Sequence, residues 1–477
     1  MAKNLMKTSD KSNFILNMTE EKYSGIAGIG LMFACLSVSL FTIPPEVSTN
    51  SSYTSSSLGL SVAGVFCMIL AFIAIIRKFI DKKALLPACA FGIMIGWGTV
   101  SMLASTDINT GLYGFPQRGE GLLAIIFYSS FFITAASLKR QKAQKAVING
   151  IILAGLANSL IALLQVFVEK FKDFRPIAYR LHFAASGLSQ SPIFLAMVLS
   201  LALIAASVTA VLDDSKKRRI LCLICSCVFA FTLIYTFSLV SLAGIGIALI
   251  FSAAAVFIRK APKKSLFLIA APAASAALAV ALCFTEIVPS NKEYKLNDGY
   301  TLWAADAFER ASASGNYDKK SVDIYDTFDV YYHLNDRTLD IIKDSPMLGT
   351  GPEQLVYPQL YTVTDQYGNE LETIADIFAV NPGTFDKVYN EYLYTTATRG
   401  IPSLIALLLI LLPVLFIGFN NAKLSLSHDN AVLFLVTLGG ALIFLIGCSN
   451  ITFAPIFWTA AGASCVCLEK KKITKKP

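Results

Sequence analysis

Long apolar stretches recur along most of the chain and are separated by short polar connections. A helix needs about 20 mostly apolar residues to cross a bilayer. The pattern predicts spans near Ser24–Ile43, Leu58–Ile76, Ala84–Ala104, Leu122–Ala136, Val147–Val168, Pro192–Val211, Ile220–Thr236, Ser238–Ile258, Ser265–Thr285, Ile401–Phe419, Asn430–Gly447 and Ile451–Leu468. Two are less regular, because the fourth is short and only "TFSLVS" separates the seventh from the eighth. We predict an all-α polytopic membrane protein with about 12 transmembrane helices.

Composition supports this class. Of the 477 residues, 55% are hydrophobic and 15% are charged, and the mean hydropathy is +0.61, values that exclude an ordinary soluble globule. All ten cysteines lie within or at the ends of predicted spans, so disulfides are not expected. The close group Cys222, Cys225 and Cys227 is typical of small packing side chains among apolar residues. We predict no metal and no cofactor.

Lysine and arginine are concentrated in alternate connections. They form "RKFIDKK", "KRQKAQK", "KKRR", "RKAPKK" and the tail "KKKITKKP", whereas the intervening connections carry almost none. Because positive loops stay on the cytoplasmic side, both termini are predicted to be cytoplasmic in a multi-pass protein of the cell (cytoplasmic) membrane. The net charge of +8 is therefore a topology signal and does not indicate a nucleic-acid partner. No secretory signal is recognised at the N-terminus.

This pattern divides the chain into five parts. They are a cytoplasmic N-terminal segment (1–23), transmembrane helices 1–9 (24–285), an extracytoplasmic loop domain with an interfacial helix (286–400), transmembrane helices 10–12 (401–468) and a basic cytoplasmic tail (469–477). The loop domain, predicted to be mainly helical, holds nineteen of the thirty-two acidic residues, nine basic residues and twelve of the eighteen tyrosines. Such a surface suits carbohydrate, although the tyrosines could instead pack a lid against the membrane rim.

Within the loop domain, "LNDRTLDIIKDSPMLGTGP" predicts a helix capped by Asn335 or Asp336 and ended by Pro346, followed by a tight turn. Arg337 would lie in the first turn, against the helix dipole. This position favours an anionic partner for Arg337. A nearby aspartate is the alternative partner.

The segment "DKVYNEYLYTTATRGIPSL" predicts a second helix, capped by Asp386 and broken from the next span at Gly400 and Pro402. Its polar groups would face a cavity between the loop domain and the spans. One predicted helical face carries Tyr389, Leu393 and Thr396, with Asn390 and Glu391 beside it. An interfacial anchoring helix is the structural alternative.

Two further external connections carry candidate ligands. "YGFPQRGEG" contains Arg118 and Glu120, and "KFKDFRPIAYRLHFAASGLSQSP" contains Arg175, Arg180 and His182. Guanidinium groups match phosphate oxygens in pairs, so several on one side indicate a diphosphate site that needs no metal. Each arginine could also be a membrane-surface anchor.

The order of these motifs resembles the bacterial O-antigen ligase and O-antigen polymerase family of membrane glycosyltransferases. The resemblance covers about Met94 to Phe419 and rests on "GFPQRGEG", "SGLSQSPIFLA", "DRTLDIIKDSPMLGTGP" and "DKVYNEYLYTTATRGIPSL". It implies that a glycan moves from an undecaprenyl diphosphate carrier to an acceptor hydroxyl on the outer face of the membrane, with inversion and without a metal. The partners implied are the lipid-linked glycan, an acceptor glycan or other surface hydroxyl, membrane lipid and other polysaccharide assembly proteins.

The resemblance also suggests site residues. Arg118, Arg180 and Arg337 would bind the diphosphate, Glu391, Tyr389 and Asn390 would act in catalysis, and Glu120, His182, Tyr392 and Asp386 would bind the glycan or acceptor. The family's usual histidine before the Asn is replaced by Tyr389, and Leu239 or Leu242 stands where an arginine usually occurs. A phenol is a poor base, with a pKa near ~10. Glu391, Asp386, His333 or His182 are therefore the candidate bases, with Tyr389 orienting the acceptor.

Three functional hypotheses remain open from the sequence. The first is a lipid-linked glycan transferase, acting as a polymerase or a ligase. The second is a lipid-linked glycan transporter, which the scarcity of ionisable residues in the middle of the spans makes less favoured. The third is a non-catalytic component of a polysaccharide assembly complex.

Overall fold

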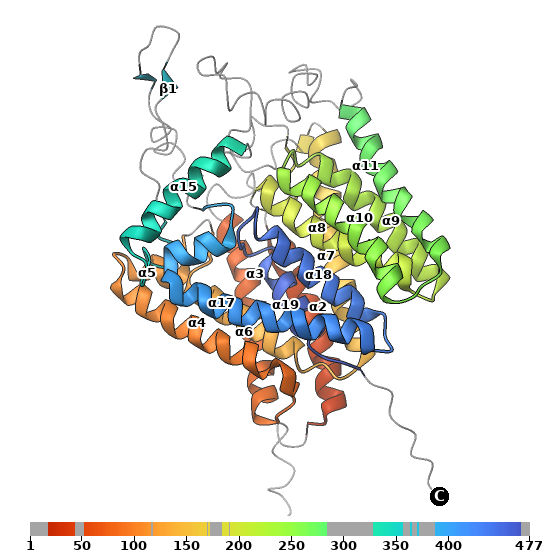
Figure 1. Cartoon of the computed structure of the whole chain (residues 1–477), viewed down its shortest axis with the longest axis horizontal. Helices are drawn as coiled ribbons and strands as arrows, with labels where there is room; N and C mark the ends of the chain where they lie inside the picture. Colours follow the sequence, from red (N-terminus) through yellow and green to blue (C-terminus); the bar gives the residue numbers. More distant parts are fainter. Residues whose placement is uncertain are drawn as a thin grey trace, which may run out of the picture.

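Helices form nearly all of the described structure (Figure 1). The computed structural model describes residues 18–42, 52–115, 118–168, 170–171, 184–189, 191–283, 328–355, 363–364, 370–371 and 387–468. Its helices are α2 (Glu20–Phe41), α3 (Ser52–Ile76), η2 (Lys82–Ala84), α4 (Leu85–Ala104), α5 (Ile108–Tyr113), α6 (Leu122–Ala135), α7 (Gln141–Phe167), α8 (Pro192–Leu212), α9 (Lys216–Ile234), α10 (Leu239–Ile258), η5 (Lys263–Ile269), α11 (Ala270–Cys283), α15 (Phe328–Asp344), α17 (Glu391–Leu424), α18 (Asp429–Ile443) and α19 (Ala454–Ser464). Strands β1 (Val363–Thr364) and β2 (Glu370–Leu371) pair antiparallel.

The chain is a helical membrane protein by the length and apolar character of its helices. Eight helical segments within the described residues are long and apolar enough to cross a membrane, namely Glu20–Phe41, Ser55–Ile76, Lys82–Ala104, Gln141–Phe167, Pro192–Leu212, Leu239–Ile258, Ser265–Cys283 and Glu391–Leu424. Each predicted span overlaps a helix within the described residues. However, α6, α18 and α19 have only 14, 15 and 11 residues, and α9 opens with four basic residues. The count of twelve spans therefore stays a prediction.

Several helices begin at a polar capping residue that precedes the apolar run. Thr19 caps α2, its hydroxyl accepting from the backbone N–H of Lys22 at 3.3 Å. Ser191 caps α8 in the same way, accepting from the N–H of Phe194 at 3.2 Å, and Pro192 occupies the first helical position. Local capping chemistry thus sets helix boundaries that hydropathy alone does not resolve.

Helix α8 forms the centre of one half of the bundle. All of its 21 residues are buried, and α7, α9, α10 and α18 pack against it. Figure 1 shows α8 among α7, α9 and α10. A helix that is apolar on every side can be enclosed in this way, because it has no polar face to expose.

The basic connections gather at one end of the bundle. Lys139, before α7, pairs with Glu20 of α2 at 3.4 Å, and Gln141 donates to Asp429 of α18 at 3.1 Å. Asp429 also lies 3.8 Å from Arg218 of α9. Arg259, after α10, donates to the carbonyl oxygens at the end of α17. The predicted alternation of basic and non-basic ends is therefore present, while the side that faces the cytoplasm stays a prediction.

Helix α17 is broken at Gly400, as predicted. Gly400 has φ 76° and ψ 170°, and the N–H of Ile401 donates to Pro346 instead of to its own helix. Because Pro402 has no N–H, the break leaves helical carbonyls without their usual partners. The N–H groups of Thr350 and Gly351 bind the carbonyls of Ala397 and Thr398, both at 2.9 Å. The segment after α15, residues 345–355, therefore completes the hydrogen bonding of the break.

Two predicted helix starts are wrong. Helix α15 begins at Phe328, so Arg337 lies in its middle and Asn335 and Asp336 are not its cap. The reason is amphipathic spacing: α15 packs on α17, with Leu334 and Thr338 fully buried, and this apolar face continues the helix through the polar pair. The predicted end before Pro346 is confirmed.

The helix before the break begins at Glu391, not near Lys387. Its cap is Asn390, whose side-chain oxygen accepts from the N–H groups of Tyr392 and Leu393, both at 3.1 Å. Tyr389 therefore precedes the helix, and the predicted helical face of Tyr389, Leu393 and Thr396 does not form. The predicted cap Asp386 lies outside the described residues.

Candidate functional site

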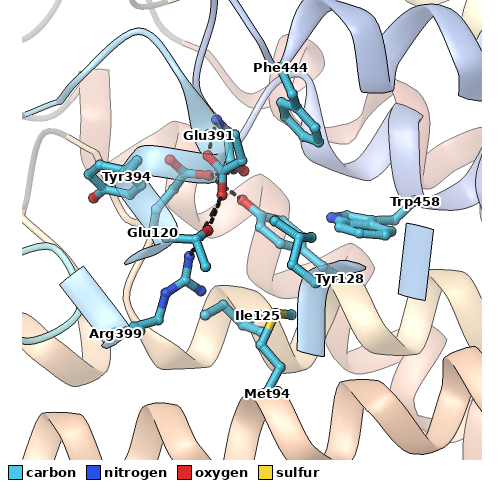
Figure 2. A pocket seen from close by; sticks show the side chains of 12 residues that line it. Met94, Glu120, Ile125, Tyr128, Glu391, Tyr394, Arg399, Phe444 and Trp458 are labelled. Atoms are coloured by element: carbon cyan, nitrogen blue, oxygen red, sulfur yellow. Dashed lines mark hydrogen bonds and ion pairs between the residues drawn. The ribbon is translucent and has the colours of Figure 1, made fainter. Parts of the chain in front are cut away.

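Polar and charged side chains from three separate parts of the chain meet beside a small cavity. The connection before α6 contributes Glu120, the first turns of α17 contribute Glu391 and Arg399, and the connection between α18 and α19 contributes Ser449. Figure 2 shows Glu120, Glu391 and Arg399 directed toward one another. The cavity has a volume of about 30 Å³ and is lined by Met94, Glu120, Ile125, Tyr128, Glu391, Tyr394, Thr395, Arg399, Leu407, Phe444, Ser449 and Trp458. This volume accommodates one or two water molecules.

Glu391 is fixed by contacts on both carboxylate oxygens. Oε2 accepts from the backbone N–H of Ser449 at 2.7 Å, and Oε1 accepts from the hydroxyl of Thr395 at 2.9 Å. Arg399 donates to the same hydroxyl at 2.9 Å and lies 3.6 Å from the Glu391 carboxylate. Glu391 occupies the first turn of α17, where the helix dipole stabilises a negative charge.

Glu120 is held in a complementary way. Its Oε1 accepts from the Tyr128 hydroxyl at 2.8 Å and from the Ser449 hydroxyl at 2.9 Å, and its Oε2 contacts the ammonium of Lys387. Ser449 therefore bridges the two carboxylates, because its N–H binds Glu391 and its hydroxyl binds Glu120. Movement of either carboxylate would disturb the other.

Lys387 joins this site to the end of the segment after α15. Its ammonium lies 3.1 Å from the Glu353 carboxylate, and the Tyr394 hydroxyl donates to Glu353 as well. Burial lowers the pKa of Lys387, but Glu120 and Glu353 together raise it by more, so this pKa lies well above its ordinary value. The ammonium remains charged throughout the neutral range.

The cavity has a polar wall and an apolar wall. The carboxylates, the guanidinium and the hydroxyls form one side, while Met94, Ile125, Leu407, Phe444 and Trp458 form the other. A hydroxyl group is about the size of a water molecule, so it can enter this space and donate to a carboxylate. Within the described residues, no group of three or more His, Cys, Asp and Glu side chains could hold a metal ion.

The structure brings together only part of the predicted site. Glu391 and Glu120 both line the cavity. Asn390 caps α17, Tyr392 donates to the carbonyl of Ala441 at 2.9 Å, and Tyr389 is buried outside the cavity lining. Asn390 and Tyr392 thus contribute to the local fold of the segment.

Of the three predicted arginines, the structure describes two, and they lie on different elements. Arg118 lies over the Phe194 ring, 5.4 Å from its centroid, near the start of α8. Arg337 is exposed on α15. Arg180 and His182 lie outside the described residues, as does Asp386.

Sequence reasoning missed several residues of the site. Arg399 and Thr395 could have been found, since they follow Glu391 at spacings of eight and four residues and so share its helical face. Lys387 and Glu353 carry no such signal. Lys387 pairs with both Glu353 and Glu120, and Glu120 is 267 residues away from it in the sequence.

No known protein family model matches the sequence, and no curated protein matches it either.

Proposed function

We propose that the protein transfers or polymerises a glycan from an undecaprenyl diphosphate carrier onto an acceptor hydroxyl, at the outer face of the cytoplasmic membrane, in surface polysaccharide assembly. The observation that carries the proposal is the pair of buried carboxylates, Glu120 and Glu391, at a cavity large enough for a hydroxyl group. Glu120 precedes α6 and Glu391 starts α17, whereas Lys139 follows α6 and Arg259 binds the carbonyls at the end of α17, so the two carboxylates lie at the end of the bundle opposite these basic residues. By the positive-inside rule this end is the external one.

The chemistry follows from these groups. The acceptor oxygen forms a bond to the anomeric carbon, and the bond between that carbon and the diphosphate oxygen breaks. The electron pair of the broken bond leaves with the diphosphate, and the hydroxyl proton passes to Glu391 as the general base. Arg399 and Thr395 hold the Glu391 carboxylate in one orientation for this transfer.

The departing diphosphate needs positive charge. Arg118 is the better candidate, because it belongs to the same connection as Glu120 and lies beside the first turn of α8, where helix N–H groups also attract anions. Arg337 is the weaker candidate, because it is exposed on α15. Arg118→Ala is therefore expected to reduce transfer more than Arg337→Ala.

The test is a membrane assay with a purified undecaprenyl diphosphate-linked oligosaccharide as donor and acceptor. Glu391→Gln is expected to reduce kcat by about 100-fold or more, and to be more damaging than Tyr389→Phe. Asp340→Asn is the matched control, because Asp340 pairs with Lys343 on exposed α15. Transfer that survives Glu391→Gln, or a stronger effect of Tyr389→Phe, would contradict the assigned base.

A transporter is the second candidate. A helix broken beside buried charges also occurs in transporters, where it lines the substrate pathway. Thr395→Cys separates the two hypotheses, because Thr395 lines the cavity. Labelling by an impermeant thiol reagent from both sides of the membrane would favour transport, and labelling from the outside alone would favour the transferase. A protein that lacks both activities would be a non-catalytic member of an assembly complex.

A further inference from the structure

The Lys387 side chain lies buried among the charged groups beside the cavity. It is 3% exposed, and its ammonium contacts the Glu120 carboxylate, the Glu353 carboxylate at 3.1 Å and the carbonyl oxygen of Ser449 at 3.1 Å. An ammonium group has three hydrogens to donate, and here it makes two hydrogen bonds, to Glu120 and to the Ser449 carbonyl, and an ion pair with Glu353. Lys387 is therefore surrounded by protein acceptors.

The contacts of Glu120 divide between its two oxygens. Oε2 binds Lys387, whereas Oε1 accepts from the hydroxyls of Tyr128 and Ser449. Glu120, Tyr128 and Ser449 all line the cavity, and Lys387 does not. The ammonium therefore binds Oε2 of Glu120, the oxygen that does not accept from the two cavity-lining hydroxyls.

We propose that Lys387 is a positioning residue, which binds Oε2 of Glu120 so that Oε1 stays at the cavity and holds the hydroxyls of Tyr128 and Ser449 in place there. The inference rests on the proposed glycosyl transfer, since it assigns Lys387 a part in the same site. Ser449 connects the position of Glu120 to that of Glu391, because it binds both carboxylates. Loss of the ammonium would therefore disturb both carboxylates.

Glu353 is the second carboxylate that contacts the Lys387 ammonium. Its side chain is 1% exposed, and its backbone has φ 57°, a conformation that is uncommon for a residue other than glycine. The turn after α15 thus brings a second carboxylate to the ammonium. A buried lysine is costly unless it is paired and hydrogen-bonded, and the second carboxylate offsets part of that cost, so Lys387 does not depend on Glu120 alone.

The first experiment compares Lys387→Met with Lys387→Arg, which keeps the positive charge. In the transfer assay, Lys387→Met is expected to lower kcat with little change in KM and to move the acid limb of the pH profile upward, because the buried Glu120 carboxylate loses the cation that it contacts. Lys387→Arg is expected to retain the wild-type profile. A purely structural role would reduce the amount of folded protein without moving the profile, and that result would overturn the proposal.

The second experiment needs no substrate. Infrared spectra of the purified proteins at pH 7 are expected to show an additional protonated carboxylic-acid band in Lys387→Met, absent from Lys387→Met/Glu120→Gln. A missing band, or one that persists in the double variant, overturns the proposal. If Lys387→Met does not accumulate, Lys387→Met/Glu353→Gln removes both charges and is measured in the same way. A wild-type protein that gives the spectral result but no glycan transfer refutes the proposed function and leaves the positioning of Glu120 standing.

Discussion

Arg399 lies two helical turns after Glu391, and its guanidinium reaches back toward that carboxylate. The side chains are only 8% and 7% exposed, so each charge depends on the other for compensation. A buried ion pair of this kind adds little net stability, but removing one partner leaves an uncompensated charge. At the residue scale, the site is therefore sensitive to changes that separate a charge from its partner.

Arg399→Ala is expected to lower the free energy of unfolding in detergent by about 3 kcal/mol, because Glu391 stays buried without its cation. Arg399→Lys keeps the charge and is expected to cost less. Adding Glu391→Gln to Arg399→Ala removes the orphaned charge and should recover part of the loss. Denaturant titrations of the variants provide the measurement, and a double variant no more stable than Arg399→Ala alone would contradict the pairing.

At the scale of elements, Glu391 and Arg399 line the cavity from the short helix that precedes the break in α17. The break is held by the segment after α15 and by α4, where Ser101 donates to the carbonyl of Thr398 at 3.1 Å and Trp97 donates to the carbonyl of Met347 at 3.0 Å. The carbonyls that a continuous helix would satisfy internally are thus satisfied by two other elements. Helix α4, the turn that follows α15 and the part of α17 before Gly400 therefore form one structural unit.

Gly400→Ala is expected to destabilise this unit. A Cβ at position 400 would lie 1.8 Å from the carbonyl oxygen of Met347, and the left-handed backbone there adds strain of about 1–3 kcal/mol. Gly96→Ala in α4 is the matched control, since a Cβ there meets no atom within 4 Å and alanine favours a helix. Thermal unfolding in detergent is the measurement. Equal stability of the two variants would show that the close approach at Gly400 is not required.

At the scale of the whole molecule, charge distribution and architecture agree. The basic connections meet at one end of the bundle through contacts such as Lys139 with Glu20, while the cavity lies at the other end. Because a lipid-linked glycan displayed outside the cell can only be reached from that face, the proposed function depends on this orientation. The orientation itself is a testable prediction.

Cysteines introduced at the two ends test the orientation. In intact cells, Asn109→Cys in exposed α5 is expected to react with a membrane-impermeant maleimide, whereas Lys263→Cys at the start of exposed η5 should react only after permeabilisation. A variant without added cysteine controls for the native Cys89, which is exposed on α4. The opposite pattern would move the cavity to the cytoplasmic side and remove the basis of the proposed function.

The sequence by itself determined where the helices lie and which ends of the bundle are basic. Each apolar run folds as a helix because a backbone away from water must satisfy its own hydrogen bonds, and this rule acts locally. The break at Gly400 was equally readable, since glycine and proline limit the local backbone. The same local patterns predicted the starts of α15 and α17 wrongly. Amphipathic packing extends α15 toward its N-terminus, and the side-chain oxygen of Asn390 caps α17.

Only the tertiary structure decided which charges meet. Glu120 and Glu391 were both candidates from the sequence, yet nothing local indicated that Ser449 would bridge them or that Lys387 would lie between Glu120 and Glu353. Such contacts depend on how helices distant in the sequence pack and on the requirement that every buried charge find a partner. That requirement is a property of the folded bundle, and no short segment contains it.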